Sequence, residues 1–138
     1  MRENDHELYD MISVPLFCES RYPVNRKAIK KTVEVVLGER GVSGNVEVAI
    51  SIVGDRKMRS LNKKYRQKDA TTDVLSFSQV EGKGGSPVPD DLLRLGDVVI
   101  SFPQARRNAG KKESLVDEEI NFLVRHALLH LLGIHHEE

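Results

Sequence analysis

The stretch VRHALLHLLGIHH, residues 124–136, decides how the rest of the chain is understood. Its histidines His126 and His130 are four residues apart, which on an α-helix places both rings on one face with their β-carbons about 5–6 Å apart. Gly133 stands where a left-handed residue commonly ends a helix, so the chain can turn back and bring His136 to the same point. Three neutral imidazoles suit Zn²⁺ and leave a fourth tetrahedral position open, as in catalytic zinc sites. The stretch therefore predicts one catalytic zinc ion per chain, held by His126, His130 and His136.

Two alternatives accompany this prediction. The helical pair could consist of structural histidines with ordinary hydrogen-bonded partners, and the third histidine past the glycine is what favours a metal. His135 could replace its neighbour His136 as the third ligand, or support a ligand without binding the metal. The zinc-protease motif has Glu directly after its first histidine as general base, whereas this chain has Ala127 there. Peptide hydrolysis is therefore the less favoured chemistry.

The composition is that of a globular protein and narrows the choice of class. The chain has 138 residues, enough to bury a core without disulfides, and we expect residues 1–138 to form a single domain. Lys plus Arg equals Asp plus Glu at 21 each, so the net charge does not indicate a polyanionic partner. Cys18 is the only cysteine, which excludes an internal disulfide. No apolar run approaches membrane-spanning length and the N-terminus is polar, so we expect a cytoplasmic protein without a membrane anchor.

Strand and helix patterns are mixed along the chain. The clearest strand is residues 45–53, where apolar side chains alternate with smaller or polar ones. Further strands are expected at 11–14, 72–78 and 96–101, helices at 25–37, 54–65, 103–108 and 114–132, and a loop at the Gly- and Pro-rich segment 82–91. These elements predict a small α/β (α+β) domain: a sheet of about four strands packed with helices, whose C-terminal helix carries the metal-binding histidines.

Capping residues mark the expected helix ends. Asn25 is a good N-cap for the first helix, and Gly110 is expected to close the helix that starts near Pro103. Ser114, with Asp117 three residues later, resembles a capping box at the start of the histidine helix.

Three separated blocks of the chain match the signatures of one family in order. They are LNKKYRQKDATTDVLSF at residues 61–77, LGDVVIS at 95–101 and HALLHLLGIHH at 126–136. Together they resemble the bacterial YbeY-type metallo-endoribonucleases, also called rRNA maturation factors. The chain departs from the family pattern at Ala127 in place of Gly, at Thr71 in place of Pro, and at Ile134 and His135 in place of Tyr and Asp. The last departure removes an acidic group and adds an imidazole beside the expected third ligand.

The resemblance implies a function and a cellular setting. It implies single-strand-specific cleavage of RNA with Zn²⁺ bound at the three histidines. It also implies cytoplasmic work with the ribosome or its small subunit, on maturation of the small-subunit rRNA 3′ end and on ribosome quality control. The implied fold is a mostly parallel sheet with the histidine helix behind it.

The second block supplies the expected RNA contacts. Arg66 matches the family's arginine and is the expected catalytic residue, because a guanidinium offers phosphate a planar, bidentate fork that a lysine cannot copy. A surface salt bridge is the alternative role for Arg66. Lys68 is expected to contact RNA beside it, whereas Asp69, Asp73 and Asp97 are expected to brace loops and backbone.

Two chemical routes and two other functions stay open at this point. Zinc could lower the pKa of a bound water to about 7 and so provide hydroxide, or it could polarise a phosphoryl oxygen while the ribose 2′-hydroxyl attacks. The other functions are a zinc hydrolase of another substrate, such as a peptide, and a non-enzymatic ribosome-associated protein whose zinc is structural. His135 could supply the fourth ligand of such a structural zinc.

Overall fold

The strand expected at residues 45–53 lies at the centre of the sheet as β3 (Val46–Val53). The structure is a computed structural model that describes residues 11–79 and 92–133, so the loop expected at 82–91 lies outside the described residues. Val46, Val48, Ile50 and Ile52 are buried in the main core, and the side chains between them are half-buried. Val and Ile suit this position because β-branched side chains pack well on a pleated surface.

Within the described residues, five strands form one mixed sheet in the order β1-β3-β5-β4, and β2 also pairs with β3. The bounds are β1 (Ile12–Ser13), β2 (Leu16–Cys18), β3, β4 (Val74–Ser78) and β5 (Leu93–Ser101). All pairings with β3 are parallel, whereas β4 runs antiparallel to β5 at one edge. The predicted mostly parallel sheet with helices is confirmed, but the part of the chain that the structure describes contributes five strands where about four were expected.

The additional strand is β2, which follows directly after the strand expected at residues 11–14. Pro15 has no N–H to continue a ladder, and it divides the segment into β1 and β2. Its carbonyl oxygen accepts a hydrogen bond from the Ile50 N–H at 2.9 Å, which keeps the two short strands along β3. β1 and β2 therefore lie end to end along β3, although Pro15 between them cannot donate a backbone hydrogen bond.

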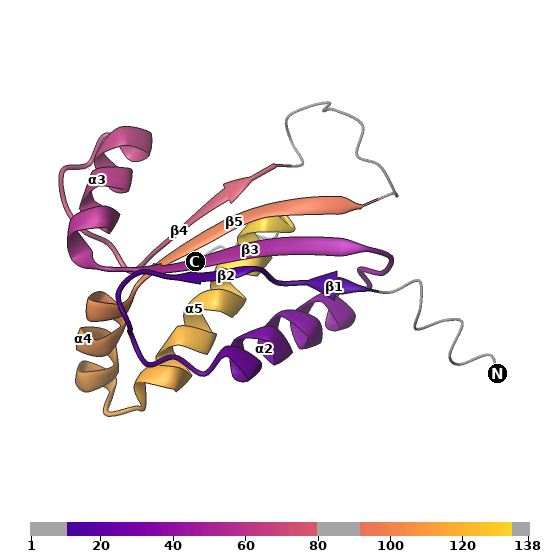
Figure 1. Ribbon diagram of the computed structural model, residues 1–138, viewed down its shortest axis with the longest axis horizontal. Helices are drawn as coiled ribbons and strands as arrows, with labels where there is room; N and C mark the ends of the chain where they lie inside the picture. Colours follow the sequence, from indigo (N-terminus) through magenta and orange to yellow (C-terminus); the bar gives the residue numbers. More distant parts are fainter. Residues whose placement is uncertain (1–10, 80–91, 134–138) are drawn as a thin grey trace.

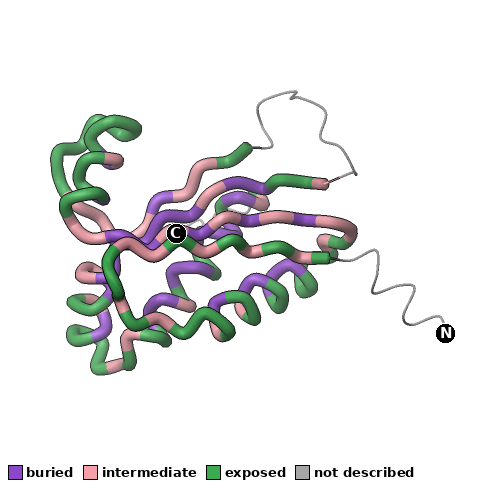
Figure 2. The backbone as a smooth tube through the Cα atoms, in the orientation of Figure 1, coloured by how far each residue is buried: buried purple, intermediate pink, exposed green. Residues whose placement is uncertain are grey.

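Helices cover the two faces of the sheet unequally. They are α2 (Arg26–Glu39), α3 (Asp55–Arg66), α4 (Phe102–Lys112) and α5 (Val116–Leu131). Helices α2, α4 and α5 lie on one side of the sheet and build the main core, whereas α3 lies on the other side above the ends of β3, β4 and β5 (Figure 1). Figure 2 shows α3 exposed along most of its length, while α5 is buried along the side that meets the sheet.

Two helices differ from expectation at their ends. The helix expected to close near Asn108 continues through Gly110 and ends at Glu113, which has the left-handed φ of 58°. Helix α5 begins after Leu115, whose N–H donates to the Glu118 Oε1 at 3.1 Å, so the capping arrangement lies one residue later than expected. Asn25 caps α2 as expected, because its Oδ1 accepts the Ala28 N–H at 3.0 Å.

A close approach of two strands explains why Gly96 is a glycine. Its φ is +151°, in a region that side chains rarely adopt, and it pairs opposite a register shift between Glu47 and Val48. A Cβ at this position would lie 2.2 Å from the Phe77 carbonyl oxygen, which belongs to the backbone of β4 and cannot easily withdraw. The pairing of β4 with β5 therefore depends on the missing side chain.

We expect Gly96→Ala to lower the free energy of unfolding by about 2 kcal/mol or more, because the methyl group forces β4 away from β5. Urea denaturation monitored by circular dichroism measures this change. Gly110→Ala is the matched control, since its Cβ would meet nothing within 4 Å in α4. That control should raise stability by up to about 1 kcal/mol. Equal stability of the two variants would contradict the close approach.

Candidate active site

Residues from three elements line one polar hollow beside the edge strand. The hollow measures about 240 Å³ and lies among the C-terminus of α3, the strand β4 and the histidine face of α5. We call it the histidine hollow. Its lining residues are Arg66, Asp73, Val74, Ser76, His126, Ala127 and His130. The structure thus brings together the two helical histidines and the arginine that the sequence singled out separately.

The imidazole pair is held in place by the burial of α5. The ring centroids of His126 and His130 are 5.3 Å apart with an interplanar angle of 34°. Ala127 and Leu128, on the adjoining face, are almost completely buried in the core. Because these side chains fix the helix against the sheet, the positions of both histidines on the wall of the hollow are fixed as well. Two adjacent imidazoles at a polar hollow are a donor set that suits a divalent transition metal.

The chain turns directly after the histidine pair. Gly133 has a left-handed φ of +80°, and its N–H donates to the His130 carbonyl oxygen at 2.9 Å. Helix α5 therefore ends beside the hollow, as the position of the glycine predicted. His135 and His136 lie outside the described residues, and no cluster of three potential metal ligands occurs within residues 11–79 and 92–133. All three metal ligands stay a prediction.

Arg66 reaches the hollow from the opposite wall. It is exposed at the last turn of α3, which ends at Gln67 in a left-handed conformation with φ of 57°. Among the described residues the ion pairs of the arginines use Arg59, Arg94, Arg107 and Arg125, so the salt-bridge alternative for Arg66 finds no partner in this part of the chain. Lys68 is exposed in the following loop and does not line the hollow.

Asp73 lines the hollow, although the sequence suggested only a bracing role. Its Oδ2 accepts a hydrogen bond from the Asn108 Nδ2 at 3.0 Å, and its backbone oxygen accepts from the Ser101 N–H at 3.0 Å. The carboxylate is therefore held by α4 and β5 while it remains part of the wall. Ser76 was also missed, but strand alternation would have placed it on the same face as Val74.

The buried carboxylate of Glu119 lies behind Asp73 and is joined to it through Asn108. Glu119 is 2% exposed and accepts hydrogen bonds from the Lys112 Nζ at 2.7 Å and the Asn108 Nδ2 at 3.2 Å. It lies seven residues before His126 on α5, so it shares the helix face that the histidine presents. The same Asn108 amide therefore joins Glu119 to Asp73 and fixes α4, α5 and the start of β4 relative to one another.

A second polar cluster fixes the start of α3. The Arg107 Nη2 donates to both oxygens of Asp55, at 3.0 and 2.8 Å, and hydroxyls of Ser101 and Thr71 donate to Asp55 Oδ1 at 3.0 Å each. Partial burial acts to raise the pKa of Asp55, but these hydrogen bonds and the charge of Arg107 together hold that pKa below its ordinary value. Asp69 is held in a comparable way, because the Arg59 guanidinium at 2.7 Å lowers the pKa of that carboxyl.

The fold and the hollow point to a class of protein. An imidazole pair that suits a metal ion, facing an arginine and a carboxylate across one polar hollow, is the arrangement that a metal-dependent hydrolase of an anionic substrate would use. Within the described residues, no helix combines the length and the apolar composition needed to cross a bilayer.

Comparison with known proteins identifies the family. The profile of the family described as "Endoribonuclease YbeY" matches residues 19–138. The protein of that name from Aquifex aeolicus is 42% identical over 115 residues, which cover 83% of this chain and 72% of the relative. The one from Moorella thermoacetica is 38% identical over 128 residues, which cover 86% of this chain and 80% of the relative. The chain therefore belongs to the endoribonuclease YbeY family.

A solved structure supports the same fold. The solution structure of a Thermotoga maritima protein matches with a TM-score of 0.57 and 25% sequence identity, covering 92% of this chain and 75% of that one. Family membership confirms both the resemblance seen in the three sequence blocks and the enzyme class, a metal-dependent nuclease that hydrolyses phosphodiester bonds within RNA. The peptide-hydrolase and non-enzymatic alternatives are thereby set aside.

The Asp55 cluster leads to a pH-dependent stability. Because the folded-state pKa of Asp55 lies below its ordinary value of 3.8, its contribution is complete above that value and is lost as pH falls through the folded-state pKa. Asp55→Asn should therefore destabilise the protein near neutral pH, and the difference from wild type should shrink in acid. Unfolding by urea at pH values from about 7 to 3 measures this.

Glu34→Gln is the matched control, because Glu34 is an exposed carboxylate on α2. It should show little difference from wild type at any of these pH values. A difference for Asp55→Asn that stays constant down to the lowest pH would contradict the lowered pKa.

Proposed function

We propose that this protein is a zinc-dependent endoribonuclease specific for single-stranded RNA, which acts in the cytoplasm on the 3′ end of the small-subunit rRNA and in ribosome quality control. The observation that carries the proposal is the meeting of His126, His130 and Arg66 around one hollow. Family membership supplies the endoribonuclease activity, and the donor chemistry of the histidines supports zinc. Work on rRNA with the ribosome rests on the sequence resemblance.

His126 and His130 would hold the metal ion with His136 as the third ligand. Three imidazoles suit Zn²⁺ and leave one position open for water or a phosphate oxygen. A metal ion bound there supplies positive charge to the phosphate and lowers the pKa of a bound water. The stacking of Phe122 on His126, with ring centroids 6.4 Å apart, covers one side of that imidazole and limits its rotation.

Arg66 would bind the scissile phosphate from the other wall. Its guanidinium can donate two parallel hydrogen bonds to two phosphate oxygens, which fixes the orientation of the phosphodiester as well as its position. Asp73 would accept a hydrogen bond from a ribose hydroxyl or from the attacking water, because Asn108 already fixes one carboxylate oxygen and directs the group toward the wall. Lys68 would contact the RNA backbone farther from the hollow.

The size of the hollow favours an unpaired strand. A space of about 240 Å³ is smaller than a typical drug-sized pocket of about 300–1,000 Å³, so it admits a phosphodiester with part of one nucleoside. An A-form duplex presents its phosphates on a continuous surface and keeps its bases stacked inside. A single strand can bend one phosphate into the hollow, whereas a duplex would have to open first.

The arginine gives the first test. We expect Arg66→Ala to reduce cleavage of a labelled single-stranded RNA about 100- to 1000-fold, and Arg66→Lys to lose most activity, because neither side chain can form the bidentate contact. Arg40→Ala is the matched control, since it removes one exposed arginine at the end of α2 without touching α3 or the histidine hollow. Full activity in Arg66→Lys, with metal retained, would remove Arg66 from the mechanism.

The product ends distinguish the two routes of attack. Attack by the ribose 2′-hydroxyl leaves a 2′,3′-cyclic phosphate on the upstream fragment, and a 2′-deoxy substitution at the cut site then abolishes cleavage. Attack by water leaves no cyclic product and tolerates that substitution. Mass spectrometry of the fragments reads either result directly.

The histidines give a separate test that does not depend on activity. We expect one Zn²⁺ per wild-type chain by elemental mass spectrometry after dialysis, and His126→Ala or His130→Ala to lose it, because removal of one imidazole breaks the donor set. His6→Ala is the control histidine, because it lies outside the residues that match the family. His135→Ala and His136→Ala compared side by side decide which of the two completes the site. Metal retained in both helical variants would contradict the proposed ligands.

A further inference from the structure

A second depression lies on the other side of the same edge strand. Side chains of a strand alternate between faces, so Val74 and Ser76 meet the histidine hollow while Leu75 and Phe77 point toward α3. There a groove of about 420 Å³ separates α3 from the open face of the sheet. We call it the α3 groove. Its lining residues are Ser51, Leu61, Tyr65, Phe77, Gln79, Asp97 and Val99.

Two aromatic rings form one wall of the α3 groove. Tyr65 and Phe77 meet edge to face, with ring centroids 5.1 Å apart and an interplanar angle of 62°. Phe77 is half-buried against the small core beneath α3, whereas Tyr65 is 52% exposed. The Lys64 Nζ lies 5.1 Å from the Tyr65 ring centroid. The pair therefore presents a half-exposed Tyr65 ring, with Phe77 packed against it and the Lys64 ammonium over it.

The charge of helix α3 suits a polyanion. The helix carries one acidic residue, Asp55, which is paired with Arg107, and six basic ones. The basic residues are all exposed, and one of them, Arg59, is paired with Asp69: Arg56, Lys57, Arg59, Lys63, Lys64 and Arg66. A basic strip beside an exposed aromatic ring is the combination that binds unpaired nucleic acid, because the charges follow the backbone and the ring stacks with bases.

The groove is continuous with the proposed catalytic site. Tyr65 directly precedes Arg66, and Phe77 directly follows Ser76, so each wall of the groove is one residue from a wall of the histidine hollow. Both sites thus flank β4, which has no further strand beyond it in the described sheet. A strand of RNA whose phosphate lies at Arg66 can pass over this edge and place a neighbouring base at Tyr65.

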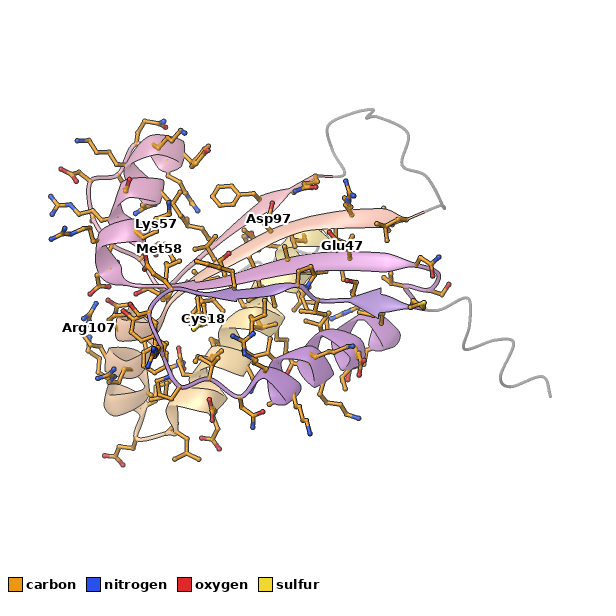
Figure 3. The ribbon with its side chains drawn as sticks, viewed as in Figure 1. Cys18, Glu47, Lys57, Met58, Asp97 and Arg107 are labelled. Carbon is orange, nitrogen blue, oxygen red and sulfur yellow. The ribbon has the colours of Figure 1, made fainter. Side chains whose placement is uncertain are left out.

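Asp97 gives the groove a polar floor. Figure 3 shows Asp97 and Glu47 on the side of the sheet away from α2 and α5, the side on which α3 lies. The Gln79 Nε2 donates to Asp97 Oδ2 at 2.7 Å, and Glu47 is 3.8 Å from the Arg94 guanidinium. A carboxylate repels phosphate but accepts hydrogen bonds from base amino groups, so the part of the RNA above Asp97 would be a base edge.

We propose that the α3 groove is a base-binding subsite of the nuclease, in which Tyr65 stacks on an unpaired base next to the scissile phosphate and Asp97 accepts a hydrogen bond from a base amino group. The proposal rests on the proposed function, since it names where the same RNA strand is held. It assigns Tyr65 a role in substrate binding, separate from the phosphate contact of Arg66. It also gives a base preference, because adenine, cytosine and guanine carry an amino group and uracil does not.

The test measures binding without cleavage. The chain contains no tryptophan, so Tyr65→Trp introduces a single indole that reports on the groove. In metal-free protein we expect its fluorescence to be quenched by a single-stranded RNA oligomer and not by the matching duplex. Tyr65→Leu should weaken binding of the single strand about 5- to 100-fold, as expected for loss of one stacked base, and Tyr65→Phe should retain most of the affinity.

The cleavage assay and a second variant complete the test. With metal-loaded protein, Tyr65→Leu should raise KM more than it lowers kcat, and all Tyr65 variants should keep the wild-type Tm within about 2–4 °C. Asp97→Asn should reduce the preference of oligo(C) over oligo(U) in the binding assay. Unchanged single-strand affinity in Tyr65→Leu, or an unquenched indole, overturns the subsite and leaves the groove to a protein partner. Failure of wild-type protein to cut RNA is a separate result, which overturns the proposed function.

Discussion

The burial of one face of α5 against the sheet is the constraint on which the site depends. Ala127, Leu128 and Leu131 fill the main core, so the helix can neither rotate nor slide without opening cavities that cost several kcal/mol. His126 and His130, on the adjoining face of the helix, are therefore held at the hollow. The opposite wall is fixed by a different contact, because Asp55 and Arg107 anchor the start of α3, and the end of that helix then carries Arg66 to the hollow. Helices α3 and α5, both bound to α4, thus face each other across an edge strand.

Polar contacts between the helices make this arrangement specific. Apolar packing opposes sliding of the helices but is itself non-directional. Glu119 and Asn108 add direction, because a buried carboxylate must keep its partners and the same amide also binds Asp73. The position of the Asp73 carboxylate in the wall of the hollow is therefore coupled to the packing of α4 against α5. A substitution at Asn108 would disturb the hollow without touching any substrate.

Much of this could be predicted from the sequence, and the reasons differ between fold and site. Alternation in residues 45–53 and the apolar stripe around His126 are local patterns, and they predicted β3 and α5 correctly. The division of the first strand follows from the missing N–H of Pro15, whereas the continuation of α4 through Gly110 depends on tertiary packing that overrides a local signal. The wall role of Asp73 depends on Asn108, 35 residues away, and no local pattern reports such a contact. Glu119 was missed because a carboxylate on a helix is usually assigned to the solvent side.

The antiparallel edge strand also determines the order in which the molecule can assemble. β4 precedes β5 along the chain but occupies the edge outside it, so β5 must insert between β3 and β4. The two strands that flank the insertion are joined through α3, and the histidine helix follows all of them. During synthesis from the N-terminus, the wall that carries Arg66 is therefore made first and the histidine wall last. The two walls of the histidine hollow come together only after nearly the whole fold has been made, so a partly synthesised chain cannot form the proposed site.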